Sequence, residues 1–395
     1  MTAYCNGQNV LLKIPKVAVE RRFWPGIRTS VSACRLLAVS ESAGALVAGW
    51  LADRALGDPQ RWHPVAGFGR LSRAVEERMW RPERRAGALY ALALVGAAGL
   101  GVSLACRLVG RLVGRHPLGR ALVASVVVWT ALGGRSLERA AENLAAAVEA
   151  GDLTRARALL PALAGRDPAS LDAAELCRAG VESVAENTAD AVTAPLLWGA
   201  VAGPGAVAAY RAANTLDAMV GHCNPRYEQF GWAAARLDDL LTWPAARLAA
   251  GLAVLLAPVA GGDRAQAWAV LRRDGAAHPS PNAGRLEATF AGALGLRLGG
   301  TNAYGDRVED RPRLGEGRPP GPDDLRRAVI LSRATGWAST AVCAGLLLGH
   351  LFSSRRPLLS ECSTTQGGVA ARRSVAEPDE LLLPPGPPTV PKATA

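Results

Sequence analysis

The sequence predicts an all-α, polytopic integral membrane protein with about 4–6 membrane helices and soluble or amphipathic helices between them. Hydrophobic residues make up 49% of the 395 residues and are concentrated in long Ala/Leu/Val/Gly runs. Arginine-rich stretches separate these runs. Alternation of period two, which is typical of half-buried strands, is scarce. Apolar runs bounded by arginine are therefore interpreted as membrane helices.

The charge pattern supports a membrane location. The formal net charge of +11 comes almost entirely from arginine, since Lys13, Lys16 and Lys392 are the only lysines. Arginine between apolar runs is typical of helix flanks that face anionic headgroups. No basic helix or aromatic-interleaved patch of the nucleic-acid-binding kind is present, so no nucleic-acid partner is expected. The seven cysteines are scattered without a C-x-x-C pair, which argues against zinc, iron–sulfur and disulfide frameworks.

Apolar runs follow one another from Leu36 to Phe352, the range expected to form the membrane-embedded domain. Residues 1–35 before it are polar and basic, lack the apolar core of a signal peptide and are interpreted as an extension. Ala86–Cys106 is the clearest span, because about twenty uncharged residues lie between flanking arginines. The other candidate runs are Leu36–Ala55, Leu122–Leu132, Ala191–Ala209, Leu248–Ala260 and Ala328–Phe352.

Soluble helices are expected mainly in residues 135–190. Ser136–Ala150 has a helical composition and ends at Gly151-Asp152, and Leu153–Leu163 is predicted as a second short helix. Tyr304–Asp324 is charged and rich in proline and glycine, which predicts a loop. Residues 353–395 are rich in serine and proline and are predicted to be a disordered tail.

An acidic stripe marks one helix of this soluble segment. Asp172 and Glu175 resemble a capping box, so a helix should begin near residue 173. At helical periodicity Glu182, Glu186 and Asp190 fall on one face. A solvated face is the simplest interpretation. However, the stripe lacks alternating lysines and runs into an apolar segment, where unpaired carboxylates are expensive. A divalent cation or a cationic partner would relieve their repulsion.

Other polar clusters also lie beside apolar sequence. Asn214 and Asp217 are three residues apart on one helical face, and Asp238-Asp239 is a paired aspartate of the kind that binds magnesium and phosphate. The stretch from His278 to Glu287 combines two prolines with capping residues, and Ala283–Leu294 can continue it as a helix. Its exposed amides suit a phosphate, although an ordinary capped helix is the simpler interpretation. The sequence contains no P-loop and no H-E-x-x-H motif.

Taken in order, these patches resemble the adenosylcobinamide-phosphate synthase family of cobalamin biosynthesis, the CobD/CbiB type of membrane protein. Order and spacing agree from about Leu36 to Phe352, and Arg211 stands where the family usually has lysine. The matching stretches include Leu56–Pro59 with His63-Pro64, Gly165–Asp167, Val181–Asp190, Asn214–Met219, Ala235–Asp239, Pro244–Arg247 and His278–Gly284.

The resemblance implies a ligase. Such proteins join the carboxylate of adenosylcobyric acid to (R)-1-amino-2-propanol or its O-phosphate, giving adenosylcobinamide or its phosphate. The family implies ATP and Mg²⁺ as cofactors, with the corrinoid as substrate rather than as a bound cofactor. It also implies a multi-pass location in the bacterial cytoplasmic membrane, contact with membrane lipid and other cobalamin-pathway enzymes as partners. An ion-coupled transporter and a membrane scaffold for corrinoid enzymes are the alternatives.

Three groups of site residues follow from the resemblance and the acidic clusters. The catalytic group is Glu182, Glu186, Asn187, Asp190, Asn214 and Asp217. The substrate- and phosphate-binding group is Asp58, His63, Arg166, Arg236, Arg247, Ser280, Asn282 and Glu287. The metal ligands are Glu186, Asp190, Asp238 and Asp239.

Overall fold

A computed structural model of the chain describes residues 42–59, 61, 63–112, 117–222, 224–304 and 307–353. Within these ranges the chain is almost entirely helical, which confirms the predicted all-α class. The predicted extension over 1–35 and nearly all of the predicted tail lie outside the described residues.

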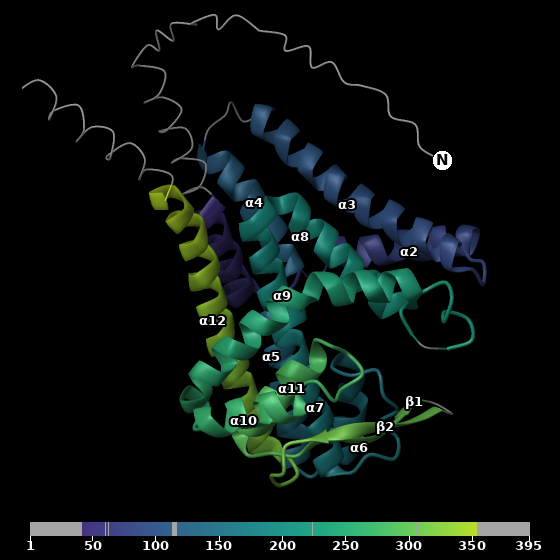
Figure 1. Cartoon of the computed structure of the whole chain (residues 1–395), viewed down its shortest axis with the longest axis vertical. Helices are drawn as coiled ribbons and strands as arrows, with labels where there is room; N and C mark the ends of the chain where they lie inside the picture. Colours follow the sequence, from purple (N-terminus) through teal and green to yellow (C-terminus); the bar gives the residue numbers. More distant parts are fainter. Residues whose placement is uncertain are drawn as a thin grey trace, which may run out of the picture. The chain divides into compact units, whose positions relative to one another are not determined.

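The elements follow one another in a simple order (Figure 1). After a helix over residues 42–56 come α2 (Pro64–Met79), α3 (Arg84–Leu112), α4 (Pro117–Ala131), α5 (Gly134–Glu149), α6 (Leu153–Leu159), η1 (Leu160–Ala162), α7 (Ala173–Asn187), η2 (Thr188–Thr193), α8 (Ala194–Val220), α9 (Trp232–Leu256), η3 (Ala257–Ala260), α10 (Arg264–Asp274), α11 (Ala283–Leu294), β1 (Leu298–Tyr304), β2 (Arg307–Leu314) and α12 (Pro322–Ser353).

The two largest apolar cores of the described residues lie toward opposite ends of the helical body. The larger core joins α5, α7, the second half of α9, α10 and α11, and buries Leu144, Leu176 and Phe290 completely. A smaller core joins the 42–56 helix, α4, α8 and α12 around Trp50 and Leu196. Figure 1 shows α3, α4 and α8 at one end, with α6, α10, α11 and the strands at the other.

Four stretches of the described chain are long and apolar enough to cross a membrane. They are Arg84–Leu112, Leu118–Glu149, Ala173–Val220 and Trp232–Ala260. In α3, Leu89, Leu92 and Leu100 are exposed by 64%, 63% and 75%. Side chains of this kind face lipid rather than water in a membrane helix, so the chain is a membrane protein.

The predicted segment Ala191–Ala209 reverses direction and does not run straight. Gly203 has φ 76° and ψ −167°, a conformation open almost only to glycine, and Pro204 begins the return helix. The Tyr210 hydroxyl therefore donates to the backbone oxygen of Asp190 at 3.1 Å. In a continuous helix these residues would be about 30 Å apart. The two arms of α8 thus form a re-entrant helical hairpin, a reversal that the predicted run Ala191–Ala209 did not indicate.

Several local predictions are confirmed. Asp172 caps α7, and the capping box with Glu175 is complete. Ala283–Leu294 forms α11 over the predicted range, and the two helices expected over 136–163 appear as α5 and as α6 with η1. These signals depend on neighbouring residues in the chain, which explains why they could be recognised.

The predicted loop over Tyr304–Asp324 is wrong in its first half. β1 and β2 pair antiparallel, with Thr301 opposite Asp310 and Leu298 opposite Leu314. Leu298 and Leu314 are fully buried in the larger core, which anchors one end of the ribbon. The strands are short and polar along most of their length, so their alternation was too weak to predict them.

Candidate active site

A cavity of about 460 Å³ lies where α7, η2, α8, α9 and α11 meet, at the base of the helical hairpin. Ten of the predicted site residues line it, although they come from distant parts of the sequence. They are Arg166, Glu182, Glu186, Asp190, Asp217, Asp238, Asp239, Ser280, Asn282 and Glu287.

One wall of this cavity is acidic. Glu186, Asp190 and Asp217 contribute carboxylates from α7, η2 and α8. Asp190 lies in the π-helical turn η2, an irregularity that is frequent at functional sites. The Asn214 side-chain amide lies 3.5 Å from Asp190 Oδ2 and 3.3 Å from Asp238 Oδ1. Asn214 thus supports the wall from behind and does not line the cavity itself.

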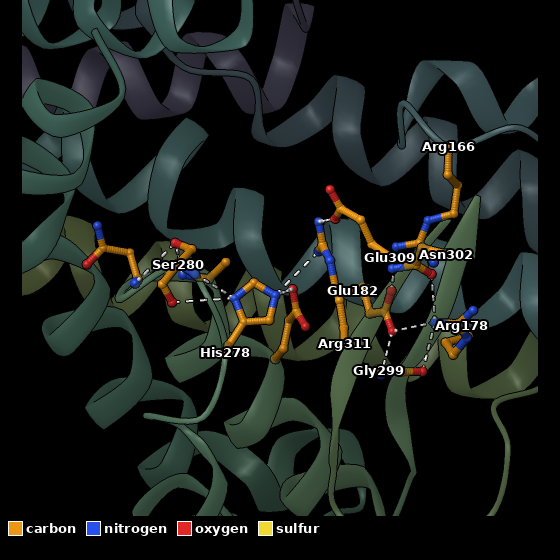
Figure 2. Close-up of polar contacts among 12 residues, drawn as sticks. Arg166, Arg178, Glu182, His278, Ser280, Gly299, Asn302, Glu309 and Arg311 are labelled. Atoms are coloured by element: carbon orange, nitrogen blue, oxygen red, sulfur yellow. Dashed lines mark hydrogen bonds and ion pairs between the residues drawn. The ribbon is translucent and has the colours of Figure 1, made fainter. Parts of the chain in front are cut away.

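Glu182 differs from the other acids because its carboxylate is fully engaged. The side chain is buried, and Oε2 accepts a hydrogen bond from Arg166 Nη2 at 2.6 Å. Its Oε1 accepts from the Gly299 amide at 2.8 Å and from Arg178 Nη1 at 3.3 Å. Figure 2 shows this network at the start of β1. Glu182 thus holds Arg166 and the strands in position, and its predicted catalytic role stays a prediction.

Basic groups line the same cavity. Arg166 is 6% exposed, and its Nε and Nη1 are buried without a hydrogen-bond partner among the described residues. Buried guanidinium nitrogens of this kind are strong donors to carboxylate or phosphate oxygens. Arg311 reaches the cavity from β2, and its Nη1 lies 3.3 Å from His278 Nε2. Figure 2 shows His278 between Ser280 and Arg311.

Burial shifts the pKa of two further residues that line the cavity. Burial, with the negative charges of Glu182 and Glu186, raises the pKa of Glu287 well above the ordinary glutamate value. Burial and the positive charge of Arg311 lower the pKa of His278. A Glu287 carboxylate oxygen lies 3.9 Å from His278 Nε2. The pair therefore favours a neutral imidazole beside a carboxyl that holds its proton to unusually high pH.

The start of α11 is already capped. Ser280 Oγ accepts hydrogen bonds from the amides of Asn282 and Ala283. Asn282 donates from Nδ2 to the Asp239 backbone oxygen at 2.8 Å and accepts from Arg247 Nη1 at 2.8 Å. Arg247 lies over the Trp243 ring and holds Asn282 in place without lining the cavity. The simpler interpretation of this motif, a capped helix, thus accounts for much of its polarity.

Six predicted site residues lie outside the cavity lining; Asn214 and Arg247 are described above, and the other four are Asp58, His63, Asn187 and Arg236. Asn187 donates to the Ser183 backbone oxygen, and Arg236 is a largely exposed residue 3.8 Å from Asp239. His63 caps α2 by accepting from the Val65 amide. The Asp58 backbone amide donates to Ser136. Their functional roles stay predictions.

Sequence reasoning missed two basic residues of the cavity. His278 belongs to a motif that was recognised, but the imidazole itself was not assigned a role. Arg311 lies in the segment predicted as a loop, and only the pairing of β1 with β2 brings it to the cavity. No pattern around Arg311 distinguishes it from the other arginines of this segment.

The predicted metal ligands share the acidic wall but do not form a prepared metal site. Glu186, Asp190, Asp238 and Asp239 all line the cavity. Among the residues that the structure describes, no group of three or more His, Cys, Asp or Glu side chains converges closely enough to hold a metal ion.

Comparison with known proteins identifies relatives over most of the chain. The family described as CobD/Cbib protein matches residues 46–332. The cobalamin biosynthesis protein CobD of Mycobacterium tuberculosis is 50% identical over 309 residues, covering 78% of this chain and 96% of the relative. Its counterpart in Chromobacterium violaceum is 43% identical over 305 residues, covering 76% and 96%. The Rhodobacter capsulatus protein of the same name is 41% identical over 293 residues, covering 71% and 90%. No solved structure matches the chain.

Proposed function

This chain belongs to the CobD/Cbib protein family of cobalamin biosynthesis, and we propose that its cavity forms an amide between a corrinoid carboxylate and an amino alcohol or its phosphate. The corrinoid substrate is adenosylcobyric acid, and the amine is (R)-1-amino-2-propanol or its O-phosphate. ATP supplies the driving force. The proposed location is the bacterial cytoplasmic membrane, with the cavity where the re-entrant hairpin meets the larger core.

The presence of carboxylates and arginines in one cavity carries this proposal. A protonated amine fits the acidic wall of Glu186, Asp190 and Asp217. An anionic group fits the buried Nε and Nη1 of Arg166, which have no partner among the described residues. A molecule with an ammonium group at one end and a phosphate at the other would satisfy both sets of groups at once. We therefore favour the phosphorylated amine as the substrate.

The chemistry needs an activated carboxyl group, because a free carboxylate is a poor acyl donor. Transfer of the γ-phosphoryl group of ATP to a carboxylate oxygen gives an acyl phosphate and ADP, and adenylyl transfer gives an acyl adenylate and pyrophosphate. The neutral amine nitrogen attacks the acyl carbon, the C–N bond forms, and phosphate or AMP leaves and takes the N–H proton released by amide formation. Because the attack requires a neutral amine, a base first takes the ammonium proton. Magnesium enters with the nucleotide as part of that substrate.

Glu287 is the proposed acceptor of that proton. Its side chain is 2% exposed and lies between the acidic residues and His278. Burial raises its pKa well above the ordinary glutamate value, so only the ionised fraction of Glu287 accepts the proton, and that ionised form is a stronger base. Arg166 orients the anionic substrate, and Glu182 and Arg178 hold Arg166 and the strands in position.

An ion-coupled transporter is the second candidate, because the broken helix α8 resembles the discontinuous helices that bind ions in carriers. Uptake of ions or corrinoid into sealed liposomes containing the purified protein would favour this alternative. Amide formation without a membrane gradient favours the ligase.

The decisive experiment is an amide-forming assay with the purified protein, adenosylcobyric acid and Mg-ATP. We expect product with aminopropanol phosphate, released together with one ADP or one AMP per amide. Arg166→Gln should lower kcat/KM for the phosphorylated amine by about 10- to 100-fold, the range for one charge-assisted hydrogen bond. The loss should be much smaller for unphosphorylated aminopropanol. Product that appears only after other pathway enzymes are added would contradict the ligase assignment and favour a scaffold.

A further inference from the structure

A second cavity, of about 390 Å³, lies among α2, α3, α4 and α8. We call it the lateral groove. Its walls are apolar and include Phe68, Ala98, Val102, Val127 and Ala208. The helices α3, α4 and α8 belong to stretches that are long and apolar enough to cross a membrane. Val126, on the same wall, is 45% exposed, so the groove reaches the surface of the described part.

Arg211 is the only charged side chain among the described residues that line this groove. Its Nη1 donates to Asn214 Oδ1 at 2.9 Å, which ties the residue to the support of the acidic wall. Its Nε is buried and has no hydrogen-bond partner among the described residues. A buried donor left without an acceptor is costly. An acceptor from outside the described chain would remove that cost.

The helical hairpin places this arginine at the boundary between the apolar and polar parts of the molecule. Arg211 follows Tyr210, whose hydroxyl contacts Asp190 beside the polar cavity. Three residues before Arg211, Ala208 lines the same groove together with Ala98 and Val102 of α3. The groove therefore combines apolar walls with a single cationic group, as a phospholipid combines an acyl chain with a phosphate.

We propose that the lateral groove binds one membrane glycerophospholipid, with an acyl chain along its apolar walls and the phosphate accepting a hydrogen bond from Arg211. Membrane lipid is the occupant that matches both features, because the groove opens on helices that face the bilayer. A free phosphate would leave the apolar walls unfilled. A neutral lipid would leave the Arg211 donor unsatisfied.

The test compares three probes on the full chain purified in detergent and depleted of lipid. Native mass spectrometry measures retention of phosphatidylglycerol and of diacylglycerol with the same acyl chains. Glycerol 3-phosphate, which has the phosphate but no chain, is added as a competitor. We expect one phosphatidylglycerol per chain, retained at least ten-fold more than diacylglycerol, and no displacement by glycerol 3-phosphate.

Two pairs of variants locate the site. Ala98→Phe fills the groove from α3, whereas Ala97→Phe adds the same ring at an exposed neighbouring position outside the lining. Ala98→Phe should lower retention of phosphatidylglycerol at least ten-fold, and Ala97→Phe should not. Arg211→Gln should lower the retention of phosphatidylglycerol to that of diacylglycerol. Arg107→Gln, at an exposed arginine of α3, should leave the retention of phosphatidylglycerol unchanged.

Equal retention of phosphatidylglycerol and diacylglycerol would overturn the proposal, as would equal behaviour of Ala98→Phe and Ala97→Phe. A chain that is dimeric and free of lipid would instead assign the groove to a second copy. Thermal unfolding of each variant shows whether it folds, and the Ala98→Phe pair leaves Arg211 and the polar cavity intact. The test uses no corrinoid or ATP, so its outcome is separate from that of the ligase assay.

Discussion

At the scale of single residues, two glutamates one helical turn apart have different surroundings. Glu182 receives hydrogen bonds from Arg166, Arg178 and the Gly299 amide, and its charge is matched inside the protein. Glu186 faces the cavity and makes no ion pair with the described residues. Helical spacing alone predicted one role for both. Their different partners give them different roles. Glu182 holds its neighbours in position, whereas the Glu186 carboxylate is available to a substrate.

Removing the charge of Glu182 should therefore destabilise the chain. Glu182→Gln leaves Arg166 and Arg178 buried with an incomplete counter-charge, and we expect a loss of about 3–5 kcal/mol in the free energy of unfolding. Glu186→Gln removes a carboxylate without breaking an ion pair in the described part, so its stability should stay close to that of the unchanged chain. Thermal unfolding in detergent measures both. Equal stability of the two variants would contradict the separate roles.

Glu287 should make the stability of the chain depend on pH. Burial raises the pKa of Glu287 in the folded chain above its unfolded value, so the folded chain binds this proton more tightly. The unchanged chain should lose stability relative to Glu287→Gln as the pH rises from the ordinary glutamate pKa through the raised one. Below the ordinary value the two Tm values should converge.

Parallel Tm measurements between about pH 4 and pH 8 test this linkage. Glu83→Gln, at an exposed position, controls for the loss of a carboxyl group. A Tm difference between the unchanged chain and Glu287→Gln that stays constant over this range would contradict the raised pKa. Glu287→Gln should also lose most amide-forming activity, because an amide cannot accept the ammonium proton.

At the scale of elements, the turn of α8 depends on one glycine. Gly203 has φ 76° and ψ −167°, and a Cβ there would strain the backbone even though nothing lies within 4 Å. Gly203→Ala should cost about 1–3 kcal/mol of stability. Gly251→Ala is the matched control, since Gly251 is helical with equally open surroundings and alanine should stabilise it by about 0.5–1 kcal/mol. Unfolding measurements that give the same sign for both variants would contradict the re-entrant turn.

Some of these elements could be predicted from the sequence, and others could not. The start of α7 at Asp172 and the range of α11 were predictable because caps and periodicity are local. The glycine–proline pair at 203–204 was visible, but composition does not distinguish the tip of a hairpin from the end of a span. The strands and Arg311 were missed because their positions depend on Glu182 and Arg178, more than a hundred residues earlier in the chain.

At the scale of the whole molecule, the candidate site lies between the larger core and the end that carries the apolar helices. The larger core supplies α7, α9 and α11, and the apolar end supplies the hairpin of α8. Non-helical backbone at membrane depth is tolerated where it is covered by protein or lines a polar cavity. The resulting cavity gathers acids from several short motifs, which the family resemblance grouped into one site without indicating how the helices bring them together.

This arrangement predicts how the whole chain responds to magnesium. Seven acidic residues line the cavity, but no three of the His, Cys, Asp and Glu side chains in the described ranges converge on one metal position. Mg²⁺ is commonly held by one or two carboxylates together with substrate phosphates. Mg²⁺ alone should therefore change the Tm little, whereas Mg-ATP should stabilise the chain by about 2.7 kcal/mol at a hundred times its Kd.

Replacing both Asp238 and Asp239 with asparagine should reduce the Tm shift caused by Mg-ATP. Asp323→Asn, at a position 88% exposed, should not reduce it. A shift with Mg²⁺ alone as large as that with Mg-ATP would require a metal site formed by the protein itself.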